Sequence, residues 1–143
     1  MTSILVAAAV VAAGVAGPTC KWDGEDAAAR AKAAAVCAAL PSATRVVVTT
    51  ESQNGTLSAI KIEYAAPAAV VLALLEAPDA KVVAFWQTIA KAIDCDQPEK
   101  IIVKGLIDKG RGLRQPRFFL LRAEKELSFQ DTVADTDRAV PLP

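Results

Sequence analysis

The dipeptide Asn54-Gly55 is the feature that most narrows the folds open to this chain. It lies between two runs rich in β-branched and apolar residues, 45–50 and 57–64. Asn-Gly is strongly preferred in two-residue hairpin turns, because both central residues of such a turn adopt a positive φ angle. The pattern therefore predicts an antiparallel hairpin. Asn54-Gly55-Thr56 also matches the N-glycosylation sequon, but the turn accounts for the same residues.

Helical periodicity lies on both sides of this hairpin. Residues 25–40 begin with acidic residues and continue as an alanine-rich stripe, which is typical of a helix packed closely on another layer. Residues 67–94 repeat apolar residues at helical spacing, and the proline at position 78 divides them into two helices. Phe85 and Trp86 fall in the second of these. We interpret them as core aromatics, with the lining of a ligand pocket as the alternative.

Residues 100–107 and 117–122 have the composition of two further strands. The order helix, hairpin, broken helix, hairpin predicts an α+β fold, with an antiparallel sheet of four to five strands and helices packed on one face. Short connections favour hairpins over crossovers. We expect a single domain at residues 20–127 and a polar, loosely held or disordered tail at 128–143.

The first nineteen residues carry no charged side chain. From Ile4 to Ala16 the chain is apolar and interrupted only by Gly14. This run fits the core of a signal peptide and is shorter than the ~20 residues of a membrane-spanning helix, so no stable membrane span is expected. Residues 1–19 are therefore interpreted as a signal peptide, and the protein as periplasmic or extracellular. Three alternatives remain open: a buried element of a cytoplasmic protein, an uncleaved anchor, and an apolar segment retained by an assembly subunit.

Three cysteines, Cys20, Cys37 and Cys95, are present. In an oxidising compartment two of them are expected to form a disulfide, and their spacing leaves every pairing open. No CxxC pair and no histidine is available to build a thiolate metal site. We therefore expect neither a metal nor a cofactor.

The absence of histidine excludes Ser-His-Asp triads, Cys-His dyads and histidine-containing zinc sites. Asp94 and Asp96 are explained by the end of a helix and lack the surrounding ligands of a calcium loop. An enzyme that uses carboxylates or a cysteine is therefore the minority interpretation.

Zero net charge conceals a basic segment. Residues 99–122 contain seven basic residues against Glu99 and Asp108, a net charge of +5. Two glycines, at 110 and 112, lie within it, and arginine forks bind carboxylates in a bidentate manner. The candidate binding residues are Lys109, Arg111, Arg114 and Arg117.

These residues predict a contact with a partner protein that has an acidic surface. No Gly-Lys-Ser/Thr follows the glycines, which excludes a Walker loop, and the neutral balance argues against nucleic acid. We predict a small exported protein-binding module: an inhibitor, immunity or accessory factor. The alternatives are an ordinary solvated hairpin, a structural or assembly subunit, and the enzyme above. The acidic residues after position 123 provide a further alternative, in which the tail folds back and masks the basic segment.

Overall fold

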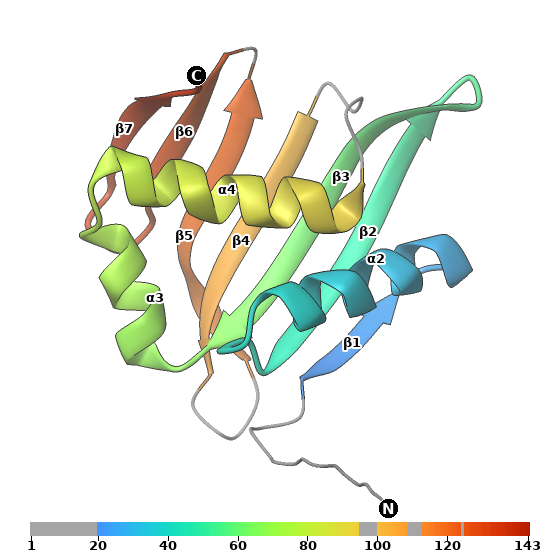
Figure 1. Cartoon of the computed structure of the whole chain (residues 1–143), viewed down its shortest axis with the longest axis horizontal. Coiled ribbons are helices and arrows are strands. Elements are labelled where there is room, and N and C mark those ends of the chain that lie inside the picture. The colour runs from blue at the N-terminus through green and yellow to red at the C-terminus, as the bar shows by residue number, and fades with distance from the viewer. Residues whose placement is uncertain (1–19, 95–99, 109–112, 124) are drawn as a thin grey trace, which may run out of the picture.

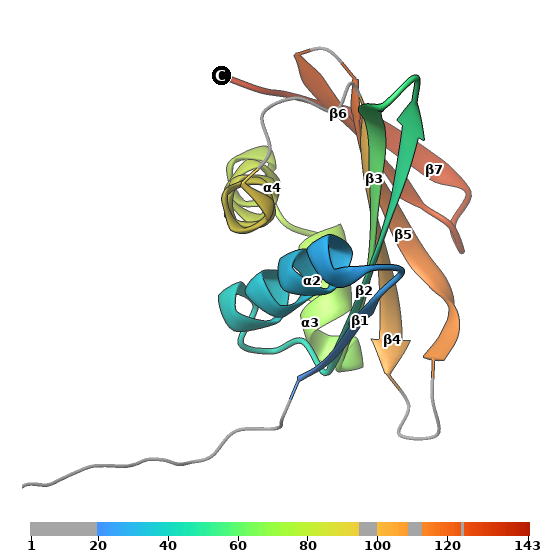
Figure 2. The same cartoon turned by 90° about the vertical axis from the view of Figure 1, so that its right-hand side faces the viewer.

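The computed structural model describes residues 20–94, 100–108, 113–123 and 125–143. Within these ranges, three helices lie on one face of a seven-stranded sheet (Figure 1). The strands are β1 (Lys21–Gly24), β2 (Arg45–Gln53), β3 (Thr56–Ala66), β4 (Lys100–Asp108), β5 (Leu113–Ala123), β6 (Glu126–Asp131) and β7 (Thr136–Pro141). The helices are α2 (Ala27–Ala39), α3 (Ala68–Leu75) and α4 (Asp79–Ile93). Seen along the sheet, all three helices lie on the same side (Figure 2).

The sheet is mixed, and its strands follow the order of the chain from β1 to β7. The pairs β1–β2 and β3–β4 are parallel, and the other neighbouring pairs are antiparallel. The α+β class is confirmed, but the expected antiparallel sheet of four to five strands is wrong. A parallel pair needs a crossover of roughly a dozen residues or more, and here α2 joins β1 to β2 while α3 and α4 join β3 to β4.

The three strands that the sequence analysis did not assign, β1, β6 and β7, lie at the two ends of the sheet. β1 is only four residues long and reads Lys-Trp-Asp-Gly, so it carries no strand-like pattern. At the other end, β6 and β7 pair in register, with Leu127 opposite Val140, and both side chains are fully buried. The expectation of a loosely held tail from residue 128 is therefore wrong.

The predicted first hairpin is confirmed. Gln53 pairs with Thr56, and the two residues between them, Asn54 and Gly55, have φ angles of 54° and 78°. Both angles are positive, as the Asn-Gly signal requires. The helical region also divides as expected, because α3 ends at Leu75 and α4 begins directly after Pro78.

The core lies between the helices and the sheet, and it contains a group of aromatic rings. Phe118 is fully buried, and its ring centroid lies 6.0 Å from that of Tyr64, 6.5 Å from Phe85 and 5.2 Å from Phe129. Burial raises the pKa of the Tyr64 phenol above its ordinary value. Trp86 on α4 is also buried and Phe85 packs against the core, so both are core aromatics as interpreted, and Trp86 in addition lines a cavity, as in the alternative.

Contacts between distant residues fasten the helices to one another and to the sheet. A disulfide joins Cys20, just before β1, to Cys37 on α2. Lys32 Nζ on α2 donates a hydrogen bond to the carbonyl of Ile93 at the end of α4 (2.9 Å). Arg138 on β7 donates to the carbonyl of Ala77 between α3 and α4 (2.7 Å). In the described ranges, no helix is both long and apolar enough to cross a bilayer.

Candidate protein-binding face

Of the four predicted binding residues, the structure describes the side chain of Arg117 alone. Lys109 and Arg111 lie outside the described residues, and for Arg114 only its place in β5 is described. Arg117 donates a hydrogen bond from its Nη2 atom to Asp131 Oδ2 (3.2 Å) and is only 24% exposed. The acidic C-terminal segment therefore does fold back onto part of the basic segment, as one of the sequence alternatives proposed.

A register shift explains the position of Arg117. Gly105 pairs with Phe118, but the next residue of β4, Leu106, pairs with Pro116, so Arg117 has no direct partner on β4. An extra residue of this kind bends the strand locally and redirects its side chain. The Arg117 Nε atom is buried without a hydrogen-bond partner. This arginine therefore contributes to the packing of β5 against β6.

The sheet face opposite the helices has a different character. Along a strand, alternate side chains point to opposite faces, so Val46 and Val48 face the helices while Val47 points away from them. The register then continues the outward row from Val47 through Glu63 and Lys104 to Phe119. No helix of the described chain covers this side of the sheet (Figure 2). We call this surface the open face.

The open face contains a cavity of about 360 Å³. Its apolar lining includes Val47, Ile102 and Phe119, and all three side chains are half-buried. Its charged lining consists of Lys61, Glu63 and Lys104. The cavity thus combines an apolar surface with two ammonium groups and one carboxylate.

The two lysines are held differently. Lys104 Nζ lies 3.1 Å from Glu63 Oε2 and 5.3 Å from the centroid of the Phe119 ring, so two contacts fix it. Lys61 Nζ lies 3.8 Å from Glu51 Oε2, and both side chains are more than half exposed. Exposed pairs of this kind contribute ~0–1 kcal/mol, so Lys61 can exchange its partner at little cost.

The sequence analysis did not find this face because it assigned residues to strands without assigning which of their side chains point to each face of the sheet. A signal was present, since residues 46–48 and 101–103 are continuous apolar runs. Such runs are typical of strands with apolar neighbours on both faces, whereas a strand with one solvated face alternates with polar residues.

No group of three or more His, Cys, Asp or Glu residues within the described ranges is arranged to hold a metal ion. Asp94 ends α4 in a left-handed conformation with φ of 49°, as its interpretation as a helix-end residue expects. Cys95 and Asp96 lie outside the described residues. The expected disulfide is confirmed, and it pairs Cys20 with Cys37.

Comparison with protein-family models, with curated proteins and with solved structures gave no match.

Proposed function

We propose that this protein is an exported module that binds another protein through the open face of its sheet. The observation that carries the proposal is the cavity of about 360 Å³ on that face, where no helix of the described residues covers the half-buried apolar side chains. Apolar surface on an uncovered sheet face is stabilised when a partner excludes water from it. Inhibitors, immunity proteins and accessory factors are the classes that act in this way without catalysis.

The charges define the chemistry of the partner. Lys61 and Lys104 lie beside the apolar lining, and among the described residues Glu63 is the one carboxylate that lines the cavity with them. A partner segment with an apolar side chain flanked by acidic residues therefore matches this surface. Of the predicted basic residues, Lys109 and Arg111 lie between β4 and β5 in the sequence and Arg114 lies in β5, and we retain these three as part of the proposed contact. Arg117 is already paired with Asp131.

The proposal of export is supported by the disulfide and by the apolar residues 1–19. Structural disulfides persist in oxidising compartments and are rare in the cytosol of mesophiles. Intact mass of the protein purified from its own host tests this step. Cleavage near residue 16 or 17, with an oxidised Cys20–Cys37 pair, is the expected result, and an uncleaved chain with free thiols refutes export.

The binding face is tested by photo-crosslinking in the native host. A benzophenone amino acid replaces Phe119 on the open face or, as a matched control, Lys81, which is exposed on α4. We expect a discrete protein adduct from position 119 and none from position 81. Addition of the charge reversal Lys61→Glu should reduce the adduct at least several-fold, because it removes one of the two cations beside the cavity.

The outcomes of this experiment separate the possible interpretations. An adduct at the mass of two copies assigns the open face to self-association and overturns the proposal of a different partner. No adduct from position 119, or equal adducts from both positions, also overturns it. An adduct that Lys61→Glu leaves unchanged contradicts the requirement for an acidic partner.

A further inference from the structure

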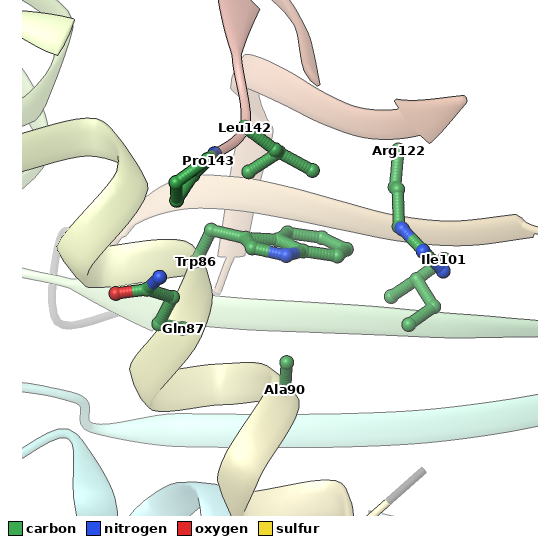
Figure 3. A pocket seen from close by; sticks show the side chains of 7 residues that line it. All are labelled: Trp86, Gln87, Ala90, Ile101, Arg122, Leu142 and Pro143. Carbon is green, nitrogen blue, oxygen red and sulfur yellow. The ribbon is translucent and has the colours of Figure 1, made fainter. Parts of the chain in front are cut away.

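A second cavity, of about 240 Å³, lies on the helix side of the sheet (Figure 3). Trp86 and Ala90 contribute to it from α4, and Ile101 from β4. Arg122 closes one side from β5, and Leu142 closes it from the C-terminal segment. The cavity is therefore built by segments that are distant in sequence, and the sheet separates it from the open face.

Arg122 is the unusual member of this lining. Its register partner on β6 is Leu127, a core residue, so the side chain points to the helix side of the sheet. It is half-buried, yet it has no hydrogen-bond or ion-pair partner among the described residues. Two other arginines near β6 and β7, Arg117 and Arg138, are both paired with carboxylates. A guanidinium carries five donors, so Arg122 can offer several of them to an anionic ligand.

The rest of the lining complements this cation. Trp86 is 4% exposed, and its indole extends across the cavity toward Arg122, with Leu142 on one side and Ala90 on the other (Figure 3). Among the described residues no aspartate or glutamate lines the cavity, and Gln87 and the C-terminal residue Pro143 complete its lining. Arg122 also borders a more open hollow with Lys125 and Glu126, but Glu126 forms no ion pair with it. The cavity therefore presents hydrogen-bond donors beside an apolar surface.

We propose that this cavity binds a small organic acid: a carboxylate that carries a compact apolar group. The carboxylate accepts hydrogen bonds from the Arg122 guanidinium, and the apolar group packs between Trp86, Ile101 and Leu142. The volume of about 240 Å³ fits this size, since a cavity of ~150 Å³ is known to hold benzene and a carboxylate adds three atoms. The proposal is independent of the open face.

The test uses benzoate as the probe and Trp86 fluorescence as the signal. The background variant is Trp22→Phe, because Trp22 is exposed and contributes signal unrelated to the cavity. We expect saturable binding of benzoate, and at least tenfold weaker binding of benzamide, which has the same shape without the charge. Acetate, which lacks the apolar group, should also bind at least tenfold more weakly.

Two variants locate the site, and a third controls for the loss of charge. Arg122→Gln removes the cation, and Ala90→Leu fills the cavity without altering a charge; each should weaken benzoate at least tenfold. Arg45→Gln removes an exposed arginine on β2 and should leave the affinity unchanged. Thermal unfolding of each free variant shows that it is folded.

Three results would overturn the proposal. The first is equal affinity for benzoate and benzamide, and the second is wild-type affinity for benzoate in Arg122→Gln or Ala90→Leu. The third is no binding of benzoate to the parent protein at about 10 mM, a concentration at which even weak ligands bind. A short peptide with a free C-terminal phenylalanine distinguishes the source of the carboxylate. If the peptide binds more tightly than benzoate, the natural ligand is the carboxyl terminus of a chain. If the peptide binds more weakly than benzoate, the natural ligand is a free organic acid.

Discussion

Replacing Gly105 by alanine should destabilise the protein, although glycine is a poor residue for the interior of a strand. Gly105 lies in β4 directly opposite Phe118 of β5. A Cβ atom at this position would lie 2.1 Å from Phe118 Cε2 and 2.4 Å from Cζ. The aromatic ring thus occupies the space that any side chain at residue 105 would need.

The size of the effect follows from how far the ring must move. Ordinary contact of a Cβ atom begins at 3.4 Å, so the ring edge would have to retreat by about 1.3 Å. Phe118 is fully buried and already packs against Tyr64, Phe85 and Phe129, so its ring can move only by displacing other core side chains. Overpacking of a core costs ~1–3 kcal/mol, while alanine in place of glycine in a strand gains ~0.5–1 kcal/mol. Because the ring must move by more than 1 Å, we take the upper end of this cost, and after the gain is subtracted we expect the free energy of unfolding to fall by about 2 kcal/mol.

Equilibrium denaturation followed by tryptophan fluorescence measures this change. A double-mutant cycle with Phe118→Leu provides the control, because the smaller side chain vacates the space that the new methyl group needs. The combined variant should be more stable than the sum of the two single effects predicts, with a coupling of about 1 kcal/mol or more. A Gly105→Ala protein as stable as the wild type, or additive free energies in the cycle, would refute the steric argument.

Three further predictions concern the contacts that hold the layers together. Replacing Cys20 and Cys37 by serine should lower the free energy of unfolding by about 3 kcal/mol, because the disulfide closes a loop with a sequence separation of 17; denaturation with and without reductant measures it. Arg138→Ala should cost about 1 kcal/mol, because β7 loses its hydrogen bond to the Ala77 carbonyl, and amide exchange in β7 should rise; unchanged exchange contradicts this. Burial raises the pKa of the Tyr64 phenol, so the folded state keeps that proton when the unfolded state releases it near pH 10.0. The contribution of Tyr64 to stability is fully present below that pH and is lost as the pH rises further. The phenolate absorbance of this single tyrosine should therefore appear together with unfolding. Tyr64→Phe should flatten the alkaline loss of stability.

The parts of the fold that the sequence predicts correctly depend on local signals. The Asn54-Gly55 turn needs only two residues and their positive φ angles. The ends of α3 and α4 need only the proline between them and the helical spacing of apolar residues. Each of these signals acts within a few residues of the structure it determines, so a single sequence is sufficient to read it.

The strands at the ends of the sheet depend on partners that are distant in sequence. β1 has no apolar pattern, and it is stabilised by pairing with β2 and by the Cys20–Cys37 disulfide. In β6, Leu127 and Phe129 alternate with polar residues, which is a strand signal. The polar composition of the surrounding residues obscured that signal. The strand becomes evident only when β5 and β7 supply its neighbours.

The candidate site was less predictable than the fold because the net charge of a segment does not show on which face of the sheet each charged side chain lies. The segment 99–122 has a net charge of +5, but its basic residues serve different parts of the molecule. Lys104 lies on the open face beside Glu63, whereas Arg117 is paired with Asp131 at the register shift of β5. Glu63 and Asp131 both lie outside residues 99–122, so a count of the charged residues within this segment could not reveal these two ion pairs.

Arg122 completes this division of the basic segment between the two faces of the sheet. It faces the helices, as its register with Leu127 requires, while Lys104, opposite Phe119, faces away from them. A sheet keeps side chains of opposite faces apart, because the backbone and the core lie between them. A change at Arg122 therefore leaves the contacts of Lys104 intact, and a change at Lys61 or Lys104 leaves the helix-side cavity intact. Loss of benzoate binding and loss of the crosslinked adduct should consequently be separable in single variants, and a variant that abolishes both would indicate that the sheet itself had been disrupted.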